Sequence, residues 1–126
     1  MLVGKMWKIL VVDNELAILQ LMKTILESDK YNVDTASNGL EALEKIEVNS
    51  YDLILSDIAM PVMDGITFYN ELKIRYPSLL HHFVFMSGSL MEPDVMDFLK
   101  QSQATYIKKP FKVNTLNELL NRVLLT

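Results

Sequence analysis

One stretch decides the fold class: Tyr51-Asp52-Leu53-Ile54-Leu55-Ser56-Asp57-Ile58-Ala59-Met60-Pro61-Val62-Met63-Asp64-Gly65. Its apolar run, residues 53–55, predicts a strand covered on both faces, as in a parallel sheet between two layers of helices. The run ends at Asp57, and a Pro, an Asp and a Gly follow before the next amphipathic segment. In such sheets the ligand crevice lies beyond the carboxyl ends of the strands. The stretch therefore predicts a buried strand that delivers Asp57 to a crevice.

Apolar runs alternate with helical patterns along the rest of the chain. Further strands are predicted at Lys8–Val12, Tyr31–Ala36, Phe83–Met86 and Thr105–Ile107. Apolar residues recur at helical spacing between and after the strands: Ile18, Leu21, Met22 and Ile25; Ala42, Leu43 and Ile46; Phe68, Tyr69, Leu72 and Tyr76; Val95, Phe98 and Leu99; and Leu116, Leu119, Leu120, Val123 and Leu124. Asn114 or Thr115 is expected to cap the last helix. Five strand-helix units predict right-handed crossovers and a doubly wound α/β sheet, with the less apolar second strand at an edge.

Composition limits the possible functions. A chain of 126 residues that is 50% hydrophobic is expected to form one domain with a real core. The absence of cysteine excludes disulfides, thiolate zinc sites and cysteine nucleophiles, and it fits a reducing cytoplasm. A net charge of -4 and a pI near 5.1 argue against direct nucleic-acid binding. Residues 1–8 lack a secretory h-region, and no apolar run approaches a membrane span. We therefore expect a soluble cytoplasmic domain.

Polar residues follow four of the predicted strands. They are Asp13 and Asn14 after the first strand, Asp57 after the third, Ser87 after the fourth and Lys109 after the fifth. Because these strand ends converge in a doubly wound sheet, the carboxylates, amide, hydroxyl and ammonium are expected around one crevice. Crowded carboxylates recruit Mg²⁺, a cation that prefers oxygen ligands. Mg²⁺, a lysine and a hydroxyl can together hold a phosphoryl group while a carboxylate attacks its phosphorus.

These motifs carry a specific resemblance. They are Ile9-Leu10-Val11-Val12-Asp13-Asn14-Glu15, Asp57 within residues 57–65, Phe85-Met86-Ser87-Gly88 and Lys108-Lys109-Pro110-Phe111. In this order, and each at a strand end, they resemble the receiver domain of two-component response regulators, and the chain is similar in size to the chemotaxis response regulator. The resemblance covers residues 1–126. It implies one receiver domain with a flavodoxin-like, five-stranded parallel sheet of order 2-1-3-4-5 and five helices.

The resemblance also implies a role for each site residue. Asp57 accepts a phosphoryl group from a sensor histidine kinase or a histidine phosphotransfer protein, with Mg²⁺ as cofactor. The metal ligands are Asp13, Asn14, Asp57 and the Ala59 carbonyl, and the Lys109-Pro110 bond resembles the family's cis peptide. Lys109 contacts the phosphoryl oxygens, Ser87 closes onto them and Tyr106 rotates inward. The domain is thus a switch and not an enzyme, with a possible homodimer through the face formed by the fourth helix, fifth strand and fifth helix.

Simpler readings compete with these assignments. Asp13 and Asp64 are also suited to helix N-caps, and residues 87–89 to an ordinary turn. Lys109 fits a surface lysine, and Tyr106 a half-buried aromatic. His81 and His82, adjacent in sequence, share neither a helix face nor a strand face, so they form a poor metal site and are expected in a solvated loop.

Three other functions fit parts of the sequence. The loop Asp13-Asn14-Glu15 disfavours a flavodoxin-like cofactor binder, because its two carboxylates repel the flavin phosphate unless a metal is present. An aspartyl-nucleophile phosphatase or phosphotransferase typically carries a second Asp two residues after the first, where this chain has Ala59. A degenerate receiver that acts only through protein contacts is opposed by Asp57, Ser87 and Lys109. Asn14 keeps that alternative open, because the family usually has an acidic residue there.

Overall fold

The computed structural model describes residues 6–126, so the expectation that residues 1–5 belong to no secretory signal lies outside the described part of the chain. The elements are β1 (Lys8–Val12), α1 (Leu16–Ser28), β2 (Asn32–Ala36), α2 (Gly39–Val48), β3 (Leu53–Asp57), α3 (Gly65–Arg75), the 3₁₀ helix η1 (Pro77–His82), β4 (Phe83–Ser87), α4 (Pro93–Ser102), β5 (Thr105–Lys108) and α5 (Val113–Leu124). All strand pairs are parallel, in the order β2-β1-β3-β4-β5. The predicted sheet order and edge strand are confirmed.

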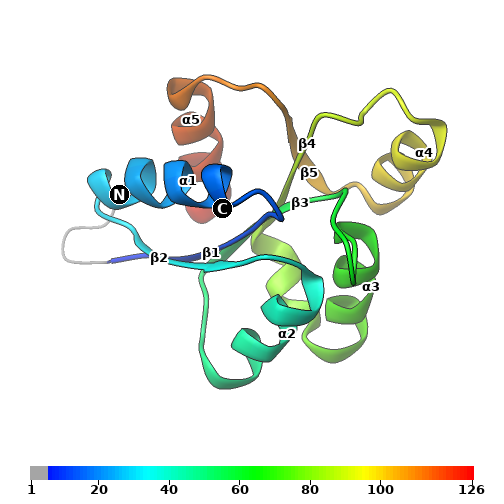
Figure 1. Cartoon of the computed structure of the whole chain (residues 1–126), viewed down its shortest axis with the longest axis horizontal. Coiled ribbons are helices and arrows are strands. Elements are labelled where there is room, and N and C mark those ends of the chain that lie inside the picture. Colours follow the sequence, from blue (N-terminus) through cyan, green and yellow to red (C-terminus); the bar gives the residue numbers. More distant parts are fainter. Residues whose placement is uncertain (1–5) are drawn as a thin grey trace.

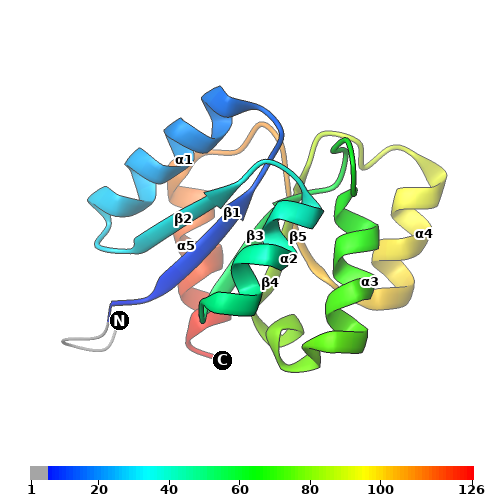
Figure 2. The same cartoon turned by 60° about the horizontal axis from the view of Figure 1, so that its bottom comes forward.

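Two layers of helices cover the sheet (Figures 1 and 2). Alternate residues of β1 point to opposite faces: Ile9 and Val11 pack with α1 and α5, whereas Leu10 and Val12 pack with α2, α3 and α4. Every residue of β3 is buried. Burial on both faces of the sheet therefore explains the continuous apolar run at residues 53–55. None of the helices within residues 6–126 has the length and apolar character that a membrane span requires.

Helix α1 buries a face shifted from the predicted one: Met22 is buried as predicted, and Ile18 is partly buried against the core. Leu19, Met22 and Leu26 pack into the core, whereas Leu21, assigned to the core face by its spacing, is 54% exposed. The segment is apolar nearly all round, so two stripes fit helical spacing equally well. Packing against β1, β2 and α5 selects one stripe and leaves the other on the surface.

Three local predictions need correction. Helix α5 begins at Val113 with Lys112 at its N-cap position, so neither Asn114 nor Thr115 caps it. The reason is that the Leu116 N–H donates to the Lys112 carbonyl at 3.1 Å, and the fully buried Leu116 side chain holds that first turn in place. The connection after α3 forms η1 instead of an irregular loop. The second strand starts at Asn32, one residue later than expected.

Side-chain contacts fasten the edge strand at the amino end of the sheet. The Tyr51 hydroxyl donates to Asp34 Oδ2 of β2 at 2.7 Å, and Lys8 Nζ lies 3.6 Å from the same oxygen. Trp7, just before β1, packs half-buried against the core on the α1 and α5 side, and its carbonyl accepts the Asn32 N–H at 2.9 Å. These contacts tie β2 to the start of β1 and to the residues just before β3.

Tyr51→Phe is expected to lower the free energy of unfolding by about 1 kcal/mol at neutral pH, because it removes a hydrogen bond to a carboxylate. That hydrogen bond is the chief reason why the pKa of Asp34 lies below its usual value; burial opposes it, and Lys8 and Lys45 assist it. Since the folded pKa is lowered, this stabilisation is present above about pH 4 and is lost progressively as the pH falls toward the folded pKa.

Urea unfolding of the parent and of Tyr51→Phe at pH 7 and at acidic pH measures this effect. The difference between the two proteins should shrink on acidification. Tyr106→Phe is the control, because it removes an exposed hydroxyl. A deficit of Tyr51→Phe that stays constant or grows as the pH falls contradicts the assignment.

Candidate functional site

Three charged side chains meet at the carboxyl edge of the sheet. Asp13 follows β1, Asp57 is the last residue of β3, and Lys109 follows β5. Lys109 Nζ lies 2.7 Å from Asp13 Oδ2 and 3.2 Å from Asp57 Oδ2, so one ammonium bridges two carboxylates. The exposed fractions of the Asp13, Asp57 and Lys109 side chains are 0%, 11% and 20%. Residues far apart in the sequence thus form one largely buried charged cluster.

The backbone holds the remaining carboxylate oxygens. The Glu15 N–H donates to Asp13 Oδ1 at 2.9 Å, and the Ile58 N–H donates to Asp57 Oδ1 at 2.7 Å. Each of the four oxygens therefore has a hydrogen-bond donor and retains a further acceptor position. Both carboxylates are fixed in orientation and can still accept from a ligand.

Burial is the largest single influence on the pKa of Asp57 and on the pKa of Lys109. Burial, together with the charge of Asp13, raises the pKa of Asp57, although Lys109 acts in the opposite direction. Burial by itself lowers the pKa of Lys109, but the hydrogen bond from its ammonium to Asp13 and the charges of both carboxylates outweigh it, and the net pKa is raised. Lys109 consequently stays charged and acts as the counter-ion of the two aspartates.

Ser87 ends β4, beside β3 and β5. It is fully buried, and its carbonyl accepts the Lys109 N–H at 2.8 Å. Its hydroxyl accepts the Ser89 N–H at 3.0 Å and shares a hydrogen bond of 2.8 Å with the Ser89 hydroxyl. The sequence pattern located Ser87 but missed Ser89 as its partner, because only the local turn brings the two hydroxyls together.

The loop after Asp57 folds back onto the end of β3. The Gly65 N–H donates to the Ile58 carbonyl at 2.8 Å. A Cβ at position 65 would lie 2.1 Å from the Asp57 carbonyl oxygen, so only glycine fits there. Asp64 is the N-cap of α3 and accepts the Thr67 N–H at 2.8 Å. The turn-forming residues of the opening stretch therefore position the backbone that carries Asp57.

The other predicted site residues are exposed and lie outside the charged cluster. Asn14 and Ala59 are exposed next to Asp13 and Asp57 in the chain. Tyr106 of β5 is 45% exposed, so its ring is not packed inside the molecule. The Lys109-Pro110 peptide bond is cis, as predicted.

The donor set at this edge suits Mg²⁺. Two buried carboxylates supply hard oxygen ligands with free acceptor positions, and a divalent cation would offset both the burial of Asp57 and the nearby charge of Asp13, which together raise the pKa of Asp57. Within residues 6–126 no group of three or more His, Cys, Asp or Glu side chains is placed to hold a metal by itself. A cation here would therefore keep several waters, as Mg²⁺ usually does in proteins.

Comparison with known proteins decides the family. The family model described as the response regulator receiver domain matches residues 9–121. The chain belongs to this family. Receiver domains are signalling switches that sensor kinases generally phosphorylate, and they bind Mg²⁺ at the phosphorylation site.

Relatives with curated descriptions and solved structures agree. The Bacillus subtilis chemotaxis protein CheY is 32% identical over 118 residues, which cover 93% of this chain and 97% of that protein. A CheY-like receiver domain from Methanospirillum hungatei is 30% identical, with a TM-score of 0.86 and coverage of 95% and 94%. The Thermotoga maritima regulator TrrA, solved in complex with Mg²⁺-BeF, is 31% identical, with a TM-score of 0.80 and coverage of 94% and 99%.

Other matches are longer proteins. The Klebsiella oxytoca transcriptional regulatory protein ZraR is 33% identical over 96% of this chain but 27% of its own length. The Bacillus subtilis regulator PhoP is 36% identical over 93% of this chain and 48% of its own length. This receiver domain thus spans about a quarter to a half of the length of these regulators.

Two of the simpler readings are now decided. Asp64 is a helix N-cap, as that reading proposed, whereas Glu15 and not Asp13 occupies the N-cap position of α1. Lys109 is not an ordinary surface lysine, because it is mostly buried between two carboxylates. In this receiver domain the pattern of strand-end residues was therefore more informative than the local capping pattern.

An apolar groove of about 460 Å³ runs beside the charged cluster. It is lined by Ile18, Leu21, Met22 and Ile25 of α1 and by Lys109, Pro110, Phe111, Val113 and Leu116. The α1 residues are those that helical spacing assigned to the core. The helical spacing of these apolar residues predicted the helix correctly. It did not distinguish the residues that pack in the core from those that line the surface groove.

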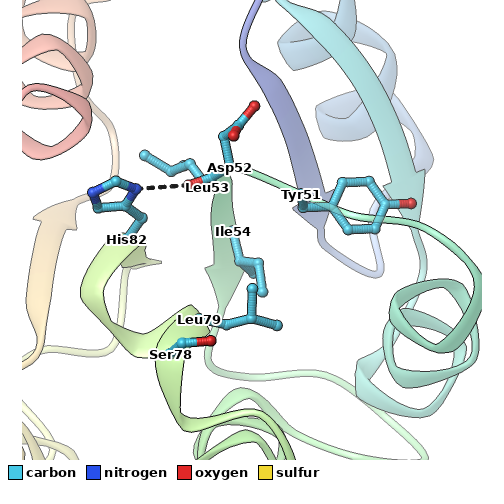
Figure 3. Close-up of a pocket in the computed structure, with 7 residues that line it drawn as sticks. All are labelled: Tyr51, Asp52, Leu53, Ile54, Ser78, Leu79 and His82. Atoms are coloured by element: carbon cyan, nitrogen blue, oxygen red, sulfur yellow. Dashed lines mark hydrogen bonds between the residues drawn. The ribbon is translucent and has the colours of Figure 1, made fainter.

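A hollow of about 230 Å³ lies at the opposite end of the sheet, between the start of β3 and η1 (Figure 3). His82 Nδ1 lies 2.9 Å from the Asp52 carbonyl oxygen, while the Tyr51 ring points away from Ser78 and His82. His82 is half-buried on η1, which corrects the expectation of a solvated loop. The contact joins η1 to β3 far from the charged cluster.

Proposed function

We propose that this receiver domain accepts a phosphoryl group on Asp57 from a sensor histidine kinase or a histidine phosphotransfer protein, and that it signals through the resulting change of conformation. The observation that carries this proposal is the bridge from Lys109 to both Asp13 and Asp57 at the carboxyl edge of the sheet. This arrangement offers the Asp57 carboxylate as the nucleophile and the Lys109 ammonium as a cation for the phosphoryl oxygens.

In the proposed transfer, Asp57 Oδ2 forms a bond to phosphorus while the bond from phosphorus to the donor's histidine nitrogen breaks. That nitrogen keeps the electron pair. The Ile58 N–H holds Oδ1 at 2.7 Å, whereas Oδ2 lies beside the Lys109 ammonium at 3.2 Å, so we assign the attack to Oδ2. After the transfer, the Lys109 ammonium contacts a phosphoryl oxygen, where the negative charge then lies.

Mg²⁺ supplies charge neutralisation for the phosphoryl oxygens when it is bound. Asp13, Asn14, the Asp57 carboxylate and the Ala59 carbonyl are the proposed ligands. Asn14 offers a neutral amide oxygen where the family usually has an acidic residue. We therefore expect weaker Mg²⁺ binding here than in receivers with a second acidic side chain at that position.

The proposed response involves Ser87 and Tyr106. Ser87 turns its hydroxyl toward the phosphoryl group, and the exposed Tyr106 ring moves inward, which alters the face formed by α4, β5 and α5. That face is the expected site of homodimerisation. The groove between α1 and the loop after β5 adjoins Lys109, and we assign it to docking of the phosphoryl donor.

Further expectations from the sequence remain part of the proposal. Residues 1–126 form one receiver domain that is located in the cytoplasm, catalyses no turnover of its own and binds no nucleic acid directly. The degenerate alternative, a module that acts by protein contact without phosphorylation, is disfavoured because Asp57, Ser87 and Lys109 are all present and buried or mostly buried.

Incubation with Mg²⁺ and acetyl phosphate, followed by intact-mass measurement, tests the proposal. One phosphoryl group is expected on the parent, lost on mild alkaline hydrolysis as an acyl phosphate. Asp57→Asn should take up none, because an amide does not form this linkage. Asp52→Asn is the matched control, since it changes an aspartate at the other end of β3. Equal labelling of Asp57→Asn and the parent contradicts the assignment.

A further inference from the structure

We infer that Ser89 is a positioning residue that holds the Ser87 hydroxyl in its resting orientation and so sets how readily this receiver adopts its phosphorylated conformation. The inference rests on the proposed function of Asp57, and it assigns the regulation of that site to a residue outside the charged cluster.

The contacts of the Ser87 hydroxyl carry the argument. It accepts the Ser89 N–H at 3.0 Å and shares a hydrogen bond of 2.8 Å with the Ser89 hydroxyl. A serine hydroxyl has one proton and two acceptor positions. When Ser87 donates to Ser89, its only proton is engaged. When Ser89 donates instead, both acceptor positions of Ser87 are filled. In the second arrangement the Ser87 proton is free, but in both arrangements rotation of the Ser87 side chain toward a phosphoryl oxygen moves Oγ away from Ser89 and breaks these contacts.

Packing does not restrain the middle of this turn. Gly88, between the two serines, is exposed, and a Cβ at that position would meet no atom within 4 Å. The hydrogen bonds between Ser87 and Ser89 therefore span the part of the turn that packing leaves unrestrained. Breaking one of them is inexpensive compared with repacking a core, which suits a constraint that must be released during signalling.

Ser89 is anchored in turn to the start of α4. Its carbonyl accepts the Glu92 N–H at 3.1 Å, and Glu92 is the N-cap residue of α4. A continuous chain of hydrogen bonds thus leads from the Ser87 hydroxyl through Ser89 to the first turn of a helix on the proposed signalling face. Release of Ser87 changes the constraints on that helix.

Four proteins test the inference: the parent, Ser89→Ala, Ser89→Thr and Ser102→Ala. Ser89→Ala removes the hydroxyl contact but keeps the backbone donor. Ser89→Thr retains a hydroxyl and should restore parental behaviour. Ser102→Ala is the matched control, because the Ser102 hydroxyl also accepts a backbone N–H two residues ahead, from Ala104 at 3.2 Å, at the far end of α4.

The first measurement uses the unphosphorylated protein. Three-bond Hα–Hβ couplings report the side-chain rotamer of Ser87 by nuclear magnetic resonance. A single rotamer is expected in the parent, in Ser89→Thr and in Ser102→Ala, and averaged couplings in Ser89→Ala. Unchanged couplings in Ser89→Ala overturn the inference, as does equal averaging in Ser102→Ala.

The second measurement is the affinity for beryllofluoride at saturating Mg²⁺, with beryllofluoride standing in for the phosphoryl group. Loss of one hydrogen bond from the resting state predicts binding that is roughly two- to tenfold tighter in Ser89→Ala. Equal or weaker binding than in the parent contradicts the inference. A parent that binds no beryllofluoride counts against the proposed function instead, while the couplings, which need no ligand, still decide the role of Ser89.

Discussion

Gly65→Ala is expected to lower the free energy of unfolding by more than about 3 kcal/mol and to abolish phosphorylation of Asp57. The added Cβ would lie 2.1 Å from the Asp57 carbonyl oxygen and 2.8 Å from the Ile58 Cα, both backbone atoms that cannot rotate away. Relief requires the loop to move, which breaks the hydrogen bond from the Gly65 N–H to the Ile58 carbonyl. Overpacking and a lost buried hydrogen bond together justify the magnitude.

The other described glycines provide a graded comparison. At Gly39 a Cβ would lie 2.8 Å from Cγ of the flexible Met63 side chain and 2.9 Å from the Phe68 Cβ, so a smaller cost is expected. At Gly88 a Cβ meets open space. Alanine there should leave the stability unchanged or raise it, because alanine lowers the conformational entropy of the unfolded chain. Urea unfolding followed by circular dichroism ranks the three variants, and intact mass gives their phosphorylation. A Gly65→Ala protein that is as stable as Gly88→Ala contradicts the packing account.

Lys109→Met is expected to lower the free energy of unfolding by about 3 kcal/mol in the absence of divalent cations. Without the ammonium, Asp13 and Asp57 remain as two buried carboxylates with no counter-ion. Removal of one partner from a buried ion pair is costly because the other charge stays desolvated and uncompensated. The methionine fills a similar volume, so the change tests charge more than packing.

Mg²⁺ makes this prediction diagnostic. A cation that binds the two carboxylates replaces the lost positive charge, so addition of Mg²⁺ should stabilise Lys109→Met more than the parent. Lys108→Met is the control, because it removes the exposed neighbouring lysine. In Asp13→Asn/Lys109→Met the deficit should be smaller than in Lys109→Met. Urea unfolding in EDTA and in Mg²⁺ measures the free energy of unfolding of each variant. Equal losses of stability in Lys108→Met and Lys109→Met are incompatible with the bridging role.

The residues at the ends of strands were predictable, since they depend only on the order of the elements. Asp13, Asp57 and Lys109 each follow a short apolar run, and a parallel sheet must bring such ends to one edge. The distances that make Lys109 a bridge between two carboxylates were not predictable, because they depend on rotamers and on the backbone donors at Glu15 and Ile58.

The errors have equally specific causes. Leu21 was assigned to the core because α1 carries two apolar stripes, and only packing chooses between them. Capping preference predicts Asn114 or Thr115 as the N-cap of α5, whereas burial of Leu116 fixes the first turn earlier, with Lys112 at the N-cap position. Ser89 was overlooked as a partner of Ser87 because its spacing carries no periodic signal. In each case tertiary packing or a single side-chain rotamer outweighed a local preference.

The position of Trp7 has a practical optical consequence. It is the only tryptophan of the chain, and it packs against the α1 and α5 side of the core just before β1, whereas Asp13 follows the far end of that strand. A five-residue strand spans about 16 Å, so the indole ring is remote from Asp57, the proposed phosphoacceptor. Intrinsic emission should therefore follow denaturation while remaining insensitive to modification of Asp57. A dye attached at position 106 would report the switch, so that one sample gives two independent spectroscopic signals.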